Sequence, residues 1–104
     1  GNFKLLSRYE TGVNPHGLTS GDFDKDGNLD LAVSNRTSGG ITIFIGKGNG
    51  NFENTSSIYT GNDGIAIENG DFDGDGKIDL AMVSASSHSL LFYRGDGKGG
   101  FNPW

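Results

Sequence analysis

The chain contains no cysteine and only two prolines, and its 104 residues include no long hydrophobic run. Without cysteine the protein forms no disulfide and has no thiol to act as a nucleophile or metal ligand. A transmembrane helix needs about 18 or more consecutive apolar residues, so no membrane insertion is expected. Basic residues are also few, with eight Lys and Arg, scattered along the chain, against thirteen Asp and Glu. Nucleic acid is not an expected partner, because its recognition needs clustered basic side chains.

What the chain does have is 19 glycines and two Asp-rich segments. The segment DFDKDGNLD begins at Asp22, and DFDGDGKID begins 49 residues later at Asp71. In each, carboxylates at positions 1, 3 and 5 precede a glycine at position 6, as in the first half of a calcium loop. The closing Glu of helical calcium loops is missing, and an Asp at position 9 supplies the last carboxylate. Because strand-like residues follow, the pattern predicts a calcium loop between two β-strands.

The alternative interpretation is an ordinary turn, because Asp-Gly clusters are common in turns. Two copies with four Asp at identical offsets favour a metal site, since crowded carboxylates repel one another without a cation. Oxygen-rich side chains in a flexible loop favour Ca²⁺ over Mg²⁺. We expect about two structural Ca²⁺ per chain, which would change the formal net charge from −5 to about −1. Calcium is abundant outside cells, so an extracellular or cell-surface location is expected.

The two loops belong to a repeat that runs through the whole chain at an offset of 49 residues. Residues 21–33 (GDFDKDGNLDLAV) and 70–82 (GDFDGDGKIDLAM) are identical at nine of thirteen positions. A period of 40–50 residues with short strands and Gly-rich turns is typical of a β-propeller blade. No 3.6-residue periodicity is present, so the fold class is all-β, with two four-stranded antiparallel blades and essentially no helix.

The alternating pattern predicts four strands in each repeat. In order, we expect them at residues 17–23, 29–34, 41–45 and 52–60, and at 66–72, 78–83, 90–94 and from 101 onward. Residues 3–10 indicate a further outer strand. The chain, 1–104, is therefore expected to be a single unit with an outer strand in 1–10, a first blade in 11–60 and a second blade, with an incomplete outer strand, in 61–104.

Two blades cannot close a ring by themselves, because each blade buries both faces against neighbours. We therefore expect a cyclic homo-oligomer in which the N-terminal strand of one subunit completes the second blade of the next. A trimer or tetramer is favoured, and a dimer would give four blades. The alternative is an excised piece of a longer propeller with no function of its own, which a chain starting with Gly1 rather than Met would also fit.

The Asp-rich segments and the hairpins that follow them resemble a known repeat family. Both Asp-rich segments, each followed by a G-x-G-x-G-x-F hairpin, are similar to FG-GAP repeats, also called VCBS repeats, which form the propeller heads of integrin α-subunits and occur in propeller lectins. The resemblance implies four-stranded blades with one Ca²⁺ in the loop between the first two strands. Position by position, the implied ligands are Asp22, Asp24, Asp26, the Asn28 carbonyl and Asp30, with Asp71, Asp73, Asp75, the Lys77 carbonyl and Asp79 in the second repeat.

Three functions follow as hypotheses. The first is a non-enzymatic, calcium-stabilised module for recognition or adhesion, with a protein or glycan ligand. The second is a multivalent lectin with sugar pockets between blades, as in some propellers similar to these repeats. Its candidate residues are His16, Arg36, His88, Tyr93, Arg94 and Trp104. The third, an enzyme, is not expected, because no G-x-S-x-G motif or cysteine nucleophile is present and carboxylates that hold Ca²⁺ are poor proton carriers.

Overall fold

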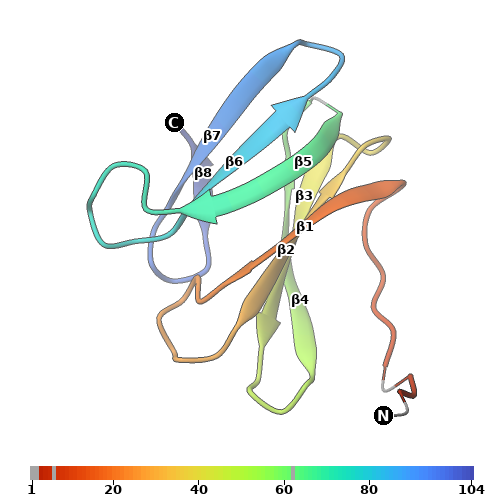
Figure 1. The fold of residues 1–104 in the computed structure, drawn as a ribbon, viewed down its shortest axis with the longest axis vertical. Coiled ribbons are helices and arrows are strands. Elements are labelled where there is room, and N and C mark those ends of the chain that lie inside the picture. Colours follow the sequence, from red (N-terminus) through yellow and green to blue (C-terminus); the bar gives the residue numbers. More distant parts are fainter. Residues whose placement is uncertain (1–2, 6, 62) are drawn as a thin grey trace.

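The protein folds into two four-stranded antiparallel sheets that follow one another along the chain (Figure 1). The computed structural model describes residues 3–5, 7–61 and 63–104. The first sheet has the order β1 (Pro15–Gly21), β2 (Asp30–Asn35), β3 (Gly40–Gly46), β4 (Phe52–Tyr59). The second has the order β5 (Gly64–Gly70), β6 (Asp79–Ser84), β7 (Ser89–Gly95), β8 (Phe101–Pro103). The described residues contain no helix, and hence none that could span a membrane.

The predicted strands are all present within residues 11–104, although the first strand of each repeat is displaced. We expected these strands at residues 17–23 and 66–72, whereas β1 and β5 begin and end two residues earlier. The reason is that the N–H of Phe23 donates to the Asp30 carboxylate at 2.7 Å rather than to a neighbouring strand. The N–H of Phe72 likewise donates to Asp79, at 3.1 Å. The bounds of the other strands agree with the prediction to within one residue.

The predicted N-terminal outer strand is only partly covered by the structure, because residues 1, 2 and 6 lie outside the described part of the chain. Its described residues, 3–5 and 7–10, are not in a strand. Instead the Tyr9 ring packs on Phe44 and Phe52, with ring centroids 5.9 and 6.0 Å away. The Tyr9 hydroxyl also accepts a hydrogen bond from the Phe52 N–H at 3.0 Å. A strand in 1–10 that completes a blade of another subunit stays a prediction.

The hydrophobic core lies between the two sheets. Alternate residues of a strand point to one face, and Ile41 and Ile43 of β3 are both buried on the face toward the second sheet. Opposite them lie Leu80 and Met82 of β6, also buried. The Phe23 ring meets the second sheet edge-on at Phe101, with the ring centroids 5.4 Å apart. The sheets are therefore held face to face by apolar burial, the usual driving force for packing sheets.

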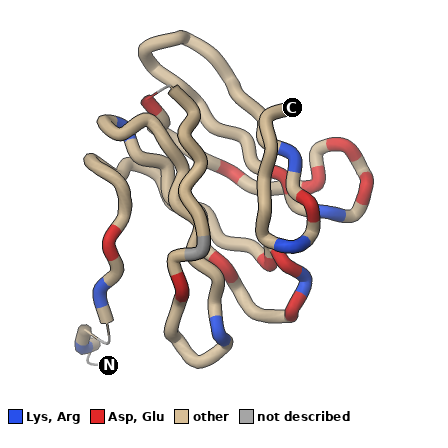
Figure 2. The backbone as a smooth tube through the Cα atoms, turned by 180° about the vertical axis from the view of Figure 1, so that it is seen from behind, with Lys and Arg blue, Asp and Glu red and all other residues tan. Residues whose placement is uncertain are grey.

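Polar contacts fix how one sheet sits on the other. The Asn69 amide donates to both the Thr19 hydroxyl and the Ser20 carbonyl at 2.6 Å. Arg36, in the turn after β2, pairs with Asp63, ahead of β5, at 3.8 Å. Hydrogen bonds from Ser86 and Ser84 lower the pKa of Asp63 to about 2, so this carboxylate is charged at neutral pH. With the sheets in this relation, the two Asp-rich loops emerge on the same side of the molecule (Figure 2).

Candidate metal centres

Each Asp-rich loop connects the first two strands of its sheet, loop 1 at residues 22–29 and loop 2 at residues 71–78. In loop 2 the carboxylates of all four predicted Asp ligands converge. One oxygen from each lies within 4.8 Å of the others, as it does for three of the four in loop 1. These two groups are Asp71, Asp73, Asp75 and Asp79, and Asp22, Asp24 and Asp30. The spacing in the sequence therefore predicted this convergence for seven of the eight carboxylates, and Asp26 is the exception.

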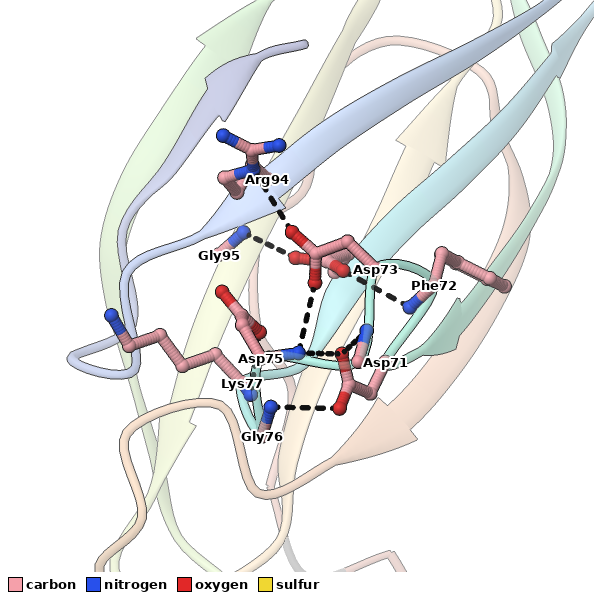
Figure 3. A network of polar contacts seen from close by, with 10 residues as sticks. Asp71, Phe72, Asp73, Asp75, Gly76, Lys77, Arg94 and Gly95 are labelled. Atoms are coloured by element: carbon pink, nitrogen blue, oxygen red, sulfur yellow. Dashed lines mark hydrogen bonds and ion pairs between the residues drawn. The ribbon is translucent and has the colours of Figure 1, made fainter.

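The carboxylate at position 1 accepts hydrogen bonds from backbone N–H groups of its own loop. In loop 2, Asp71 accepts hydrogen bonds from the N–H of Gly76 at 2.8 Å and of Asp75 at 3.1 Å (Figure 3). In loop 1, Asp22 accepts the same two bonds at 2.9 and 3.2 Å. The position-6 glycines have φ of 84° and 87°, a conformation that side chains resist. The turn therefore needs glycine, as the sequence pattern predicted.

The carboxylate at position 9 has a second role that the sequence analysis missed. Asp30 is fully buried, and its two oxygens accept hydrogen bonds from the N–H of Phe23 at 2.7 Å and of Gly46 at 2.9 Å. It therefore joins the start of loop 1 to the end of β3. Asp79 makes the equivalent bonds in the second sheet at 3.1 and 2.9 Å. The constant spacing of 16 residues between this Asp and a glycine is the signal that could have indicated the link.

The hairpin glycine in this link cannot carry a side chain. A Cβ on Gly46 would collide with the carbonyl oxygen of Leu29, and one on Gly95 would collide with that of Ile78. Because the colliding atom belongs to the backbone, no rotamer change could relieve the contact. The close approach lets the hairpin N–H reach the buried carboxylate.

The electrostatics of the loops fit a cation. Desolvation, a hydrogen bond to Asp26 and the charge of Asp30 raise the pKa of Asp24 to about 6. Desolvation likewise raises the pKa of Asp73. These shifts reflect carboxylates crowded against one another and partly removed from water. Converging, oxygen-only donors in a flexible loop are the ligands that Ca²⁺ prefers, so the residues present fit that ion.

Position 5 differs between the two loops. Asp75 belongs to the loop 2 cluster, whereas Asp26 lies outside the loop 1 cluster. Asp26 accepts a hydrogen bond from the backbone N–H of Asn28 at 2.9 Å, as Asp75 does from Lys77, and a second one from the Asn28 side-chain amide at 3.3 Å. The first of these bonds lowers the pKa of Asp26. The roles of the Asn28 and Lys77 carbonyls as ligands stay predictions.

A basic residue next to loop 2 has no counterpart at loop 1. Arg94 of β7 pairs with Asp73 at 3.2 Å (Figure 3). Its guanidinium lies 4.5 Å from the centre of the Trp104 ring. The residue 49 positions earlier is Ile45, which carries no charge. A cation at loop 2 would therefore have to compete with Arg94 for Asp73, whereas residue 45 offers loop 1 no such competitor.

Replacing Arg94 by the isoleucine of the other repeat is expected to strengthen calcium binding at loop 2. Removing one positive charge beside the site relieves repulsion of the ion, and partial exposure of the pair limits the gain to about three- to tenfold in affinity. Calorimetric titration of Arg94→Ile against the wild type measures the change. The reciprocal variant Ile45→Arg is the control and is expected to weaken loop 1. Unchanged affinities in both variants would contradict the competition.

The six candidate sugar-binding residues do not gather in one place. Tyr93 is buried in the core between the sheets, and Arg36 is paired with Asp63. His88 has φ of 52° in a tight turn, at the repeat position where Gly39 stands in the first sheet. His16 is an exposed residue of β1. Of the six, Arg94 and Trp104 are brought into contact with each other.

Comparison with curated proteins and with solved structures found no significant match. A match was found to a family described as FG-GAP-like repeat, over residues 22–82. The matched segment covers more than half of the chain and contains both Asp-rich loops and the core strands between them. It thus includes every carboxylate of the two clusters. The chain belongs to the FG-GAP-like repeat family.

Proposed function

We propose that this chain is a non-enzymatic module of a β-propeller whose two loops bind calcium for structural purposes. The observation that carries the proposal is the duplication of the whole loop architecture. Both loops hold converging carboxylates, an internal tie at position 1 and a buried carboxylate at position 9. A turn needs no such concentration of negative charge, which would oppose folding unless a cation neutralised it.

Hydrogen bonds to the carboxylates at positions 1 and 9 hold each loop in its conformation. Asp22 and Asp71 hold the loop backbone, while Asp30 and Asp79 attach it to the hairpin after the third strand. Calcium, when bound, would neutralise the repulsion among the remaining carboxylate oxygens. Its binding would therefore be coupled to folding of the first two strands of each sheet.

The larger assembly is part of the same proposal. FG-GAP-like repeats suggest a propeller, and a ring needs more blades than the two sheets of this chain. Identical subunits would supply them, with a trimer or tetramer favoured over a dimer. Sites of this kind fill most readily where calcium is abundant, so we propose an extracellular or cell-surface role in recognition or adhesion.

Native mass spectrometry in calcium tests the metal assignment directly. We expect about two calcium ions per chain of 11.0 kDa. In the variant Asp73→Asn the count is expected to fall to about one, because loop 2 loses a converging carboxylate. The control Glu53→Gln removes an exposed carboxylate of β4 outside both loops and is expected to keep both ions. A wild-type chain that stays metal-free in millimolar calcium would overturn the proposal.

Carbohydrate binding is the second candidate function. A cleft of about 390 Å³ beside loop 2 is bordered by Trp104, Arg94 and Asn102 together with the carboxylates of Asp75 and Asp96. An aromatic ring next to several hydrogen-bonding groups is a combination suited to a sugar. A glycan array probed in calcium with the wild type and with Trp104→Ala tests this site. Absence of binding by the wild type, or equal binding by both, would argue against it.

A further inference from the structure

The two halves of the chain are alike in sequence, yet equivalent apolar residues differ sharply in exposure. The buried interface between the sheets is formed on the first sheet by residues of β3 and by the start of loop 1. Their equivalents, 49 residues later, form what we call the open face of the second sheet. The buried set is Phe23 (1 % exposed), Ile41 (0 %) and Ile43 (0 %), and the open face is Phe72 (47 %), Leu90 (58 %) and Phe92 (37 %).

The open face is a hollow surface with ordered aromatic rings. Phe72, Phe92 and Trp104 stack edge to face, with successive ring centroids 5.6 and 5.8 Å apart. Together with Leu90, Leu91, Tyr93 and Pro103 they border a cleft of about 540 Å³. An apolar surface of this kind is unusual on a protein that has no partner. Its residues Phe72, Leu90 and Phe92 are the repeat equivalents of those on the first-sheet face that the second sheet covers.

The first sheet also exposes apolar residues whose repeat equivalents in the second sheet are buried between the sheets. Leu18 of β1 is 64 % exposed, whereas its equivalent Ile67 is 7 % exposed and lies in the core between the sheets. Leu29 is exposed too, whereas its equivalent Ile78 packs against that core. We call Leu18 and Leu29 the outer face of the first sheet. The described residues thus include equivalents of both halves of the internal interface, one half exposed on each sheet.

The edge of β7 is incomplete in a way that residues near the N-terminus would complete. β8 pairs with Tyr93, Arg94 and Gly95, and the Trp104 N–H donates to the Phe92 carbonyl. Within the described part of the chain no strand pairs with β7 at residues 89–91 along that edge. The equivalent edge of β3 pairs with residues 57–59 of β4. The repeat equivalents of residues 57–59 are residues 8–10 of the chain.

We propose that copies of this chain associate head to tail, the open face of one copy receiving the outer face of the next, with residues 8–10 of the second copy extending the edge of β7 in the first. This deepens the proposed propeller function and rests on it. The connection is feasible because Glu10 precedes β1 by as many residues as Tyr59 precedes β5. The segment that joins residue 10 to β1 is therefore as long as the one that joins the two sheets inside the chain.

A backbone hydrogen bond across the internal interface also has its equivalent residues at the proposed junction. Inside the chain the Gly99 N–H donates to the Phe23 carbonyl at 3.2 Å, across the interface between the sheets. Gly50 stands at the equivalent position, and its φ of 90° matches the 93° of Gly99. At the proposed junction Gly50 of one copy would donate to the Phe72 carbonyl of the other. The two faces therefore match in backbone donors as well as in apolar side chains.

Sedimentation velocity in calcium over a range of concentrations tests the association. The wild type is expected to sediment as a multiple of the 11.0 kDa chain. Phe92→Asp, on the open face, and Leu18→Asp, on the outer face, are each expected to sediment as monomers, because either change places a charge in the junction. Glu53→Gln is the control: it changes an exposed side chain of β4 outside both faces and outside residues 1–10, and is expected to leave the multimer intact.

Mixing the two monomeric variants decides whether the contact is head to tail. Phe92→Asp keeps an intact outer face and Leu18→Asp an intact open face, so the mixture is expected to form a dimer and stop there. A wild type that remains monomeric at every concentration, or a mixture that stays monomeric, overturns the proposal. Circular dichroism and the calcium count of each variant show whether it has folded. A folded, calcium-loaded monomer would refute the association and leave the calcium assignment intact.

Discussion

Removal of calcium is expected to lower the melting temperature of this protein by about 20 °C or more. If free calcium exceeds the dissociation constant of each loop about a hundredfold, each ion stabilises the folded chain by about 2.7 kcal/mol. For a chain of this size, about 5 kcal/mol from two loops corresponds to a shift of that order. The physical source is the repulsion among converging carboxylates in each loop, which the ion removes.

The measurement is a pair of thermal melts, in millimolar calcium and in excess chelator. Magnesium at the same concentration is the control and is expected to restore only part of the loss, since it fits flexible many-oxygen loops poorly. A variant with both Asp24 and Asp73 changed to Asn should lose most of its response to calcium. Identical melting curves in calcium and in chelator would rule out structural calcium.

Replacing the buried carboxylate of the first sheet, Asp30→Ala, is expected to destabilise the protein by about 3–5 kcal/mol. The substitution leaves the N–H groups of Phe23 and Gly46 buried without their acceptor. It also separates loop 1 from the hairpin that follows β3. Since small domains are stable by only about 5–15 kcal/mol, partial unfolding at room temperature would be consistent with this cost. Denaturant unfolding monitored by circular dichroism measures it.

Stability measured in calcium and in chelator distinguishes the structural role of Asp30 from a role in binding the ion. The cost of Asp30→Ala is expected to persist in chelator, because its hydrogen bonds do not depend on metal. Asp24→Asn is the matched control: it should destabilise the protein in calcium and stabilise it slightly in chelator, where it relieves crowding of charge. Asp30→Asn keeps one oxygen acceptor and should cost less than alanine. Equal stability of Asp30→Ala and wild type in chelator would contradict the structural link.

Loop 2 and the proposed junction share one residue, Phe72. Phe72 is the second residue of loop 2; its N–H donates to Asp79, and its ring lies on the open face against Phe92. In the first repeat Phe23 occupies the same place, with its N–H on Asp30 and its ring in the interface with Phe101. Ordering of a loop therefore positions an interface side chain. Calcium binding and association of copies are accordingly expected to reinforce each other.

The sequence by itself determined the features that depend on local spacing. The offset of 49 residues predicted the duplication, and alternating apolar residues predicted the strands of both sheets. The Asp spacing predicted the convergence of the carboxylates, Asp26 excepted, because a short loop closed by a glycine has few conformations. Even so, the first strand of each repeat ends earlier than expected, because the N–H groups of Phe23 and Phe72 donate to Asp30 and Asp79 rather than to a neighbouring strand.

The tertiary structure decided everything that depends on which segments become neighbours. Arg94 and Asp73 pair because strand packing brings β7 beside loop 2, and their spacing along the chain does not indicate this contact. The contrast between buried Phe23 and exposed Phe72 is the clearest case, because the two share the same local sequence. Alternation assigns a side chain to one face of a strand, and only the presence of a neighbouring sheet determines whether that face is removed from water.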